Sequence, residues 1–220
     1  MAKGTKRRVG QHHGDLRAAL LDAALAEVAE GKAESLSLRG VARRAGVSPA
    51  APYHHFADKD ALLAAVASDG FIQLNAVHDR VRAEHTMAER VLSEMVEAYV
   101  RFAIAHPAHY VLMFRASPGE QTDESGALQK QAMRSFVGLC TAIAGVNPGL
   151  AEAELRARAI LAWSMAHGAV QMVIHDLMNG LDPDMGSDPD LLARRMAQTT
   201  LLIARAPLQQ TGGRSFSAPR

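Results

Sequence analysis

The side chains best suited to catalysis in this sequence are histidines at helical spacing. His106 and His109 are three residues apart, and His167 and His175 are eight apart, so each pair could present two imidazoles on one helix face. The sequence has no Glu-x-x-His pair, no His-Glu-x-x-His motif, no glycine-rich phosphate loop and no nucleophile elbow. We therefore predict that the protein is not an enzyme and binds no cofactor and no metal. The alternative is a metal-dependent helical-bundle enzyme.

A second group of polar side chains lies between Ser37 and Lys59, where the chemistry would be recognition. Within it, "SPAAPYHHF" (48–56) places a tyrosine and two histidines directly after Pro52, in a stretch where a proline should weaken a helix. Hydrogen-bonding side chains beside cationic ones suit DNA, because cations neutralise phosphates and polar groups read base edges. An ordinary solvated helix face is the alternative reading of Arg43 and Arg44.

Composition indicates which kind of fold must position these groups. The chain has 220 residues, of which 48% are hydrophobic and 5% aromatic, and alanine and leucine dominate. That balance predicts an all-α fold. Cys140 is the only cysteine, so an intrachain disulfide is impossible. No signal peptide and no long uncharged apolar run is found, so we expect a cytoplasmic protein with no membrane partner.

Apolar periodicity predicts about nine helices and no strand. They are expected at 16–30, 37–44, 48–54, 58–81, 88–106, 108–116, 123–144, 150–178 and 191–206, with "NGLDPDMGSDPD" (179–190) as a loop. The second and third have the spacing of a helix-turn-helix, joined through Gly46. If Ser48 caps the third helix, Pro52 removes its first internal hydrogen bond, so its first turn should be loosened or start late.

The segment "SLRGVARRAGVSPAAPYHHFADKDALLAAV" (37–66) resembles the DNA-binding domain of the tetracycline-repressor (TetR) family of bacterial transcriptional regulators. The matching residues are Leu38, Arg39, Val41, Ala42, Ala45, Gly46, Val47, Ser48, Tyr53, His55, Phe56, Lys59, Ala61, Leu62 and Leu63. The resemblance implies a homodimer that binds a palindromic double-stranded operator and a helical C-terminal domain that senses a small ligand. Gly40 departs from the family, which usually has an acidic residue there, so the capping box from Ser37 is absent.

The resemblance also implies residue roles on the DNA side. Phosphate contacts are expected from Ser37, Arg39 and Arg43, a recognition surface from Ser48, Pro49, Ala50, Tyr53 and His54, and a hold on the backbone at its far edge from His55 and Lys59. The basic residues Lys6, Arg7 and Arg8 could reach a minor groove or could belong to a solvated tail. Phe56, Val47 and Leu62 are expected in the core.

The expected organisation has four parts. They are a flexible basic arm at 1–14, a helix-turn-helix DNA-binding domain at 15–63, a helical effector-binding and dimerisation domain at 82–206, and a flexible tail at 207–220, with the helix at about 58–81 linking the two domains. Dimerisation is expected through helices 150–178 and 189–206, whose apolar faces would form a four-helix bundle with a second copy.

The C-terminal region offers candidates for an effector pocket. "AWSMAHGAV" (162–170) resembles the Trp-His-Gly signature of one C-terminal subtype in the family, with Trp163 and His167 on one helix face; a packed core pair is the alternative. The candidate lining is Tyr99, Phe102, Met113, Phe114, Met133, Phe136, Trp163 and His167. The predicted function is a ligand-responsive repressor, and an effector-independent DNA-binding or architectural factor is the alternative.

Overall fold

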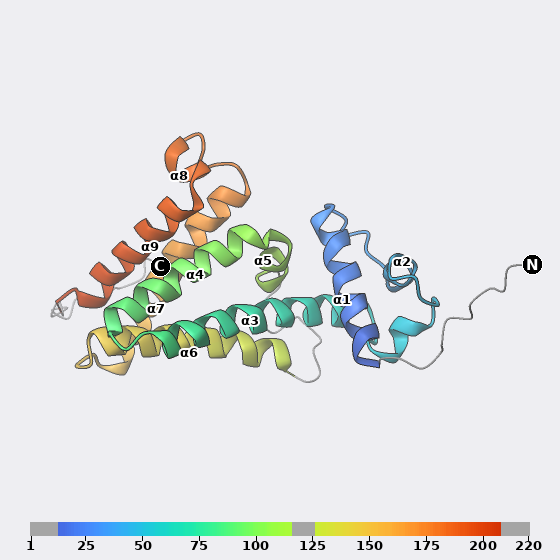
Figure 1. The fold of residues 1–220 in the computed structure, drawn as a ribbon, viewed down its shortest axis with the longest axis horizontal. Helices are drawn as coiled ribbons and strands as arrows, with labels where there is room; N and C mark the ends of the chain where they lie inside the picture. The colour runs from blue at the N-terminus through green and yellow to red at the C-terminus, as the bar shows by residue number, and fades with distance from the viewer. Residues whose placement is uncertain (1–12, 116–125, 208–220) are drawn as a thin grey trace, which may run out of the picture.

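Every regular element in the described part of the chain is helical, as predicted. The computed structural model describes residues 13–115 and 126–207 (Figure 1). Its elements are α1 His13–Ala29, α2 Leu38–Arg44, the 3-10 helix η1 Ala51–His54, α3 Lys59–Glu84, α4 Ala88–Ala105, α5 Pro107–Met113, α6 Ala127–Val146, α7 Glu152–Ile174, α8 Pro183–Ser187 and α9 Pro189–Arg205. Residues 1–12 of the predicted arm, with Lys6, Arg7 and Arg8, and all of the predicted tail except Pro207 lie outside the described residues, whereas His13 and Gly14 begin α1 instead of ending an arm.

The turn between α2 and η1 has the chemistry that the sequence predicted. The Ser37 hydroxyl oxygen accepts a hydrogen bond from the Gly40 N–H at 3.1 Å and so caps α2 without a capping box. Gly46 follows α2 at a φ of 69°, a left-handed conformation that glycine adopts without a Cβ clash. The Val47 N–H then donates to the Ala42 carbonyl at 3.0 Å, which closes the turn.

The third helix differs from the prediction. It is a four-residue 3-10 helix that begins at Ala51, and the Ser48 side chain does not cap it. Pro52 sits at a first-turn position where no N–H is needed, and its carbonyl accepts from both His55 and Phe56 at 2.9 Å. The Pro52 ring is buried. The proline therefore shortens and delays the helix, as the sequence suggested, but it does so as a core residue.

The long helix α3 connects the N-terminal helices to the rest of the molecule (Figure 1). Asp58 caps it, because its carboxylate accepts from the Ala61 N–H at 2.8 Å. It runs three residues beyond the predicted end at 81. A continuous apolar cluster extends from α1 and α2 along α3 and α5 to α7 and α9, so the N-terminal helices are not packed as an isolated unit.

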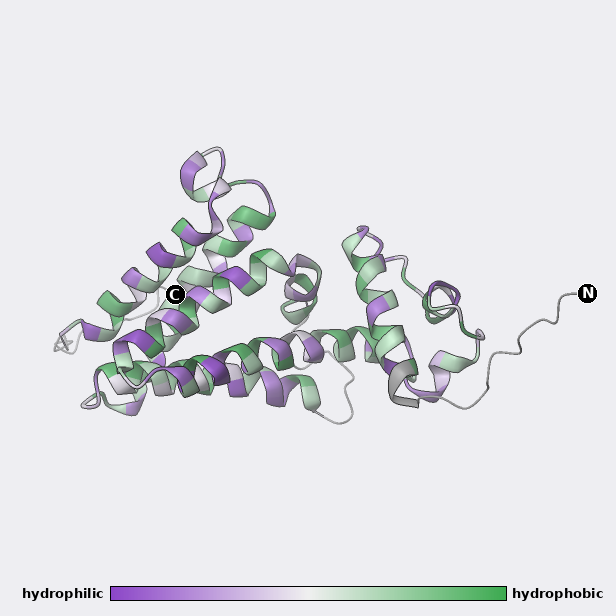
Figure 2. Cartoon of the chain, viewed as in Figure 1, coloured by the Kyte–Doolittle hydropathy of each residue, from purple (hydrophilic) through white to green (hydrophobic). Residues whose placement is uncertain are grey.

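The C-terminal helices form a bundle in which α4 packs on α9 and α6 packs beside α3 (Figure 1). Apolar and polar residues alternate around α4 and α9 (Figure 2), and the buried residues of each lie on one face. The segment predicted as a loop contains the short helix α8, which Asp182 caps by accepting from the Met185 N–H. The sequence did not predict this helix, because it is only five residues long and polar, and its composition is typical of a loop.

Two buried contacts fasten the end of α9. The Arg158 guanidinium of α7 donates to the carbonyls of Ile203 and Ala204, at 3.2 and 2.9 Å, and pairs with Glu154 at 2.8 Å. Carbonyls in the last turn of a helix have no partner within the helix, so a cation there satisfies them and the helix dipole together. None of the helices in the described ranges has the length and apolar character that crossing a bilayer requires.

Candidate functional site

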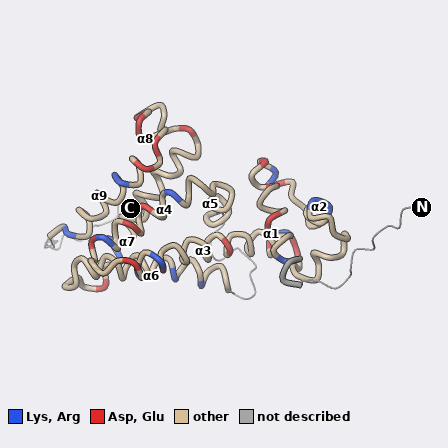
Figure 3. Tube along the Cα trace, viewed as in Figure 1, with Lys and Arg blue, Asp and Glu red and all other residues tan. Residues whose placement is uncertain are grey.

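The surface formed by α2 and η1 carries most of the residues predicted to contact DNA. Those that lie exposed are Ser37, Arg39, Arg43, Ser48, Pro49, Ala50, Tyr53 and His54. Tyr53 is the most informative of them, because a large ring that is 53% exposed in the free chain gains little from folding. Figure 3 marks the arginine positions of α2 in blue along the Cα trace. The structure shows that these residues are exposed, and their contact with DNA remains a prediction.

The three arginines of α2 differ in what holds them. Arg44 forms an ion pair with Glu30 at 2.6 Å, and this guanidinium, with Lys32, lowers the pKa of the Glu30 carboxyl to about 2. Arg39 and Arg43 have no ion-pair partner among the described residues. An exposed guanidinium without a carboxylate partner keeps its hydrogen-bond donors free for an anion such as a phosphate. On this helix, Arg39 and Arg43 are therefore the available cations.

His55 and Lys59 lie at the edge of this surface and are half-buried. The Lys59 ammonium donates to the Glu34 carbonyl at 2.6 Å, so one of its three N–H groups ties the start of α3 to the loop before α2. The His55 ring lies 6.2 Å from the Phe56 ring, and Arg17 of α1 stacks over that ring at 5.7 Å. Both residues thus have a structural role beside the DNA contact predicted for them.

A cavity of about 560 Å³ lies among α3, α4, α6 and α7, with the end of α5 at one side. Six of the eight predicted lining residues line it: Tyr99, Met113, Phe114, Met133, Phe136 and Trp163. Phe102 does not; it is buried elsewhere, with its ring 4.9 Å from that of His106. His167 does not line it either and lies behind Trp163. A volume of this size suits a drug-sized organic molecule.

The sequence prediction missed the wall that α3 contributes. Phe71 and His78 of this helix line the cavity, together with Met95 and Val96 of α4. The linking helix is apolar on more than one face, because it packs on α4, α5 and α6 at once. Periodicity therefore cannot show which of its faces meets empty space. Arg115, Gln129 and Ser135 are further lining residues without an earlier signal.

A hydrogen-bonded network stands behind one wall of the cavity. The Trp163 indole N–H donates to the Tyr99 hydroxyl at 3.3 Å, the Tyr99 and Tyr110 hydroxyls are 2.8 Å apart, and His167 Nδ1 lies 2.7 Å from Tyr110 and 3.3 Å from Tyr99. Burial raises the pKa of Tyr99 to about 12, raises that of Tyr110 as well, and lowers the pKa of His167. All three side chains are therefore neutral at pH 7.

The geometry of this network fixes the role of His167. An indole nitrogen only donates, and one hydrogen can lie between the two phenol oxygens. The hydrogens of Trp163, Tyr99 and Tyr110 can all find an acceptor only if His167 Nδ1 accepts one of them. His167 is then the tautomer that carries its hydrogen on Nε2, which lies 3.5 Å from the Gln171 side chain. Neither tyrosine has a hydroxyl hydrogen left for a ligand.

His78 adds a second neutral group to the cavity wall. Its Nε2 lies 3.1 Å from the Met95 carbonyl oxygen, which can only accept, so Nε2 carries the hydrogen. Burial lowers the pKa of His78 to about 4, and the nearby Arg82 acts in the same direction. The imidazole is thus uncharged at pH 7. Its Nδ1 is enclosed and has no hydrogen-bond partner among the described residues.

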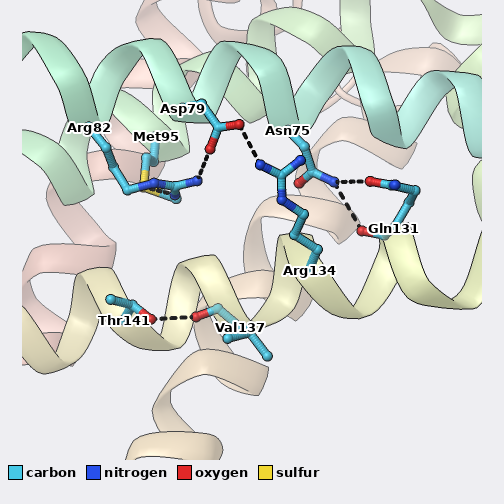
Figure 4. Close-up of polar contacts among 8 residues, drawn as sticks. All are labelled: Asn75, Asp79, Arg82, Met95, Gln131, Arg134, Val137 and Thr141. Carbon is cyan, nitrogen blue, oxygen red and sulfur yellow. Dashed lines mark hydrogen bonds and ion pairs between the residues drawn. The ribbon is translucent and has the colours of Figure 1, made fainter.

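The outer wall of the cavity, α6, is held to α3 by polar contacts (Figure 4). Asp79 pairs with Arg82 at 2.7 Å on its own helix and with Arg134 of α6 at 2.5 Å. Asn75 donates to the Gln131 carbonyl of α6 at 3.1 Å. The buried residues of α6 are confined to its two ends: Leu128, Ala142 and Ile143. The middle of this wall packs through half-buried apolar residues such as Phe136 and Leu139, and exposed or half-buried polar pairs, which are individually weak, add to that packing.

The histidine pairs that could begin a metal site are not gathered into one. His109 lies 3.3 Å from Asp69 and 6.2 Å, ring to ring, from His106, while His175 ends α7 in an exposed position. Among the described residues, no three His, Cys, Asp or Glu side chains are close enough together to hold a metal ion. Gly168 has open space where a Cβ would project, so close helix packing does not require this glycine.

Two family models match the chain over the parts just described. One, described as Bacterial regulatory proteins, tetR family, matches residues 20–66, from α1 into α3. The other, described as Tetracyclin repressor-like, C-terminal domain, matches residues 92–200, from α4 into α9. Together with the α2–η1 surface, they define a helix-turn-helix transcriptional regulator. The chain belongs to the tetracycline-repressor (TetR) family, which confirms the sequence resemblance.

Relatives along most of the chain agree with this assignment. An uncharacterized helix-turn-helix transcriptional regulator from Haemophilus influenzae is 28% identical over 191 residues, which are 86% of this chain and 89% of that protein. A protein of unknown function from Rhodococcus sp. RHA1 has a TM-score of 0.71 at 28% identity, covering 88% of this chain and 97% of its own. A tetR-family regulator from Rhodococcus RHA1 has a TM-score of 0.69 at 18% identity, covering 87% and 97%, and shows the same fold.

Proposed function

We propose that this protein is a ligand-responsive repressor that binds a palindromic DNA operator as a homodimer in the cytoplasm and is released by a small molecule. The observation that carries the proposal is the surface of α2 and η1. There, α2 carries two guanidinium groups that have no carboxylate partner among the described residues, and η1 carries an exposed tyrosine and histidine. Cations that touch phosphates fix register and affinity, and polar groups in the major groove read bases.

We assign DNA binding and effector binding to different helices of the chain. Residues 15–63 would bind DNA, with Ser37, Arg39 and Arg43 on phosphates and Tyr53 and His54 on the recognition surface. Residues 82–206 would bind the effector and the second copy, and α3 would join the two parts. The cavity supports an effector-dependent protein over an effector-independent DNA-binding factor, because α3 forms its wall and also packs on α1.

Homodimerisation is proposed through α7 and α9, although much of the apolar face expected on α7 is buried within one chain. Ala159, Ala162, Ala166, Val170 and Leu192 are buried within one chain. The large apolar residues of these helices that remain at least half exposed are Ile160, Leu161 and Leu202, at 50%, 60% and 66%. An exposed apolar set of this kind on two neighbouring helices suits an isologous contact between identical chains.

Selection of genomic fragments by the purified full-length protein tests this function. We expect one enriched sequence with two inverted half-sites, because a two-fold dimer places its recognition surfaces about 34 Å apart, one turn of DNA. Fluorescence anisotropy then gives the affinity, and its salt dependence counts the phosphate contacts. Absence of any enriched sequence, or enrichment of one half-site without its inverted copy, would contradict the proposal.

A further inference from the structure

The cavity concentrates the aromatic side chains of this protein. The sequence has six phenylalanines, three tyrosines and one tryptophan, and five of these ten residues line the cavity. They are Phe71, Tyr99, Phe114, Phe136 and Trp163. Phe71 and Phe114 meet edge to face at 5.6 Å, and Trp163 lies 5.9 Å from Phe114. Such walls offer ring edges and ring faces to a flat π-system.

Among the described residues, no acidic side chain and no lysine lines the cavity. His78 and Tyr99, which face the interior, are both neutral at pH 7 for the reasons given above. A charged ligand group placed there would lose its hydration without gaining a counter-ion, so burial of the charge would oppose binding.

Side-chain hydrogen-bond donors for a ligand inside the cavity are limited to one wall, because the Nδ1 of His78 can only accept. The hydroxyl hydrogens of Tyr99 and Tyr110 are committed to the network that ends at His167. Gln129 and Ser135, both on α6, line the cavity and form no side-chain hydrogen bond with the described residues. A ligand with one polar group could therefore meet it at α6, and the walls from α3, α4 and α7 would contact rings.

Arg115 is the one charged residue in the described lining, and it lies exposed at the end of α5. A guanidinium in water stays hydrated, and an exposed ion pair adds only about 0 to 1 kcal/mol. Arg115 can therefore tolerate a negative group at the mouth without selecting for one. The ring contacts inside cover far more of a bound molecule.

We infer that the effector is an uncharged, mainly aromatic molecule with a single hydrogen-bonding group, which lies between the aromatic walls and directs its polar group to Ser135 or Gln129 of α6. This inference rests on the proposed function, because it names the chemistry of the ligand that would release the operator. The binding itself concerns the cavity alone, and it is measured without DNA.

Four tricyclic probes of similar shape separate the possible ligand classes. Isothermal titration calorimetry of the full chain would compare 9-phenanthrol, its fully saturated analogue, phenanthrene-9-carboxylate and 9-phenanthrylmethylammonium. We expect 9-phenanthrol to bind at least about tenfold more tightly than each of the others, because aromatic pairs contribute about 0.5–1.5 kcal/mol each beyond burial. Quenching of Trp163, the only tryptophan, provides a second readout in the cavity wall.

Matched variants on α6 localise the binding. Ala132→Phe fills the cavity and should abolish 9-phenanthrol binding, whereas Val137→Phe, on the same helix but 52% exposed and not in the lining, should leave it unchanged. Phe136→Leu keeps the wall apolar and should reduce the preference for the aromatic probe over the saturated one. It remains informative if the larger substitution fails to fold.

Two outcomes would overturn the inference. One is equal or tighter binding of the saturated analogue. The other is tightest binding of the carboxylate, lost in Arg115→Gln, which would identify an anionic effector anchored at the mouth. If 9-phenanthrol binds as expected but leaves operator affinity unchanged, the proposed regulation by this cavity fails, and the aromatic preference of the cavity stands.

Discussion

At the scale of single residues, the histidine and tyrosine side chains in and behind the cavity wall share one property, which is that they are uncharged at pH 7. His78 and His167 both have pKa values lowered by burial, and Tyr99 and Tyr110 have raised ones. An imidazole would carry charge just below neutral pH if it were exposed. The enclosed position of His78, fixed by its bond to the Met95 carbonyl, holds it uncharged well into the acid range. This neutrality has a consequence for stability.

We predict that His78 makes the protein acid-sensitive. Its pKa is about 4 in the folded chain against an ordinary 6.5, so the unfolded chain binds the proton first as pH falls. The free energy of unfolding contributed by this residue is fully present above about pH 6.5 and is lost as pH falls toward 4, by about 3 kcal/mol. Urea unfolding between pH 7 and 4 should show a correspondingly smaller decline for His78→Gln; identical declines would contradict this.

At the scale of elements, the recognition surface depends on η1, a 3-10 helix of only four residues. The sequence predicted the turn at Gly46 and the late start of the third helix, because both follow from local backbone chemistry. It assigned Ser48 as a cap that does not form. It did not establish that the ring of Pro52 is buried. Burial depends on long-range packing, which local patterns do not encode.

The two prolines of this stretch provide a matched pair. Pro52→Ala removes buried ring atoms and also frees the unfolded chain, whereas Pro49→Ala, at an exposed position, has only the second effect. We expect Pro52→Ala to lower the free energy of unfolding by at least about 1 kcal/mol more than Pro49→Ala. Denaturant unfolding of both variants measures the difference. Equal losses would show that Pro52 makes no useful packing contact.

The same limit explains the C-terminal predictions. Trp163 and His167 were placed on one helix face from their spacing, and they do share one network. The sequence does not show which face of α7 packs within the chain, because a helix rich in alanine is apolar on every side. Close packing within the chain selects the small residues, such as Ala159 and Ala166, and leaves Ile160 and Leu161 outside. Which residues of α7 pack inside the chain can be seen only in the folded bundle.

At the scale of the whole molecule, the exposed residues of α7 and α9 suggest how two copies meet. We predict that Leu161→Asp weakens dimerisation by more than about tenfold, because it places a carboxylate in an apolar contact. Leu181→Asp is the control, since Leu181 is 73% exposed just before α8 and outside the proposed contact. Sedimentation velocity at several protein concentrations reports both. A Leu161→Asp protein that stays dimeric would place the interface elsewhere.

Transmission between the cavity and the DNA surface must also operate at this scale. The core cluster is continuous from α1 through α3 and α5 to α7, and α3 lines the cavity while it packs on α1. A ligand that binds one arrangement of α3 better than another would shift the spacing of the two recognition surfaces. Linkage then requires that operator and effector weaken each other by the same factor.

The central claim, that the α2–η1 surface binds the operator, is tested most directly by anisotropy titrations of the selected operator at several salt concentrations. The proteins to compare are the wild type, Tyr53→Ala, Arg43→Ala and Arg90→Ala, a control that removes a positive charge from α4, where Arg90 pairs with Glu94. We predict that Tyr53→Ala weakens binding about tenfold. Arg43→Ala should make the slope of log affinity against log salt concentration shallower by about 2, because each of the two protomers loses one phosphate contact. Arg90→Ala should change neither the affinity nor this slope. Wild-type affinity and slope in both surface variants would contradict the account.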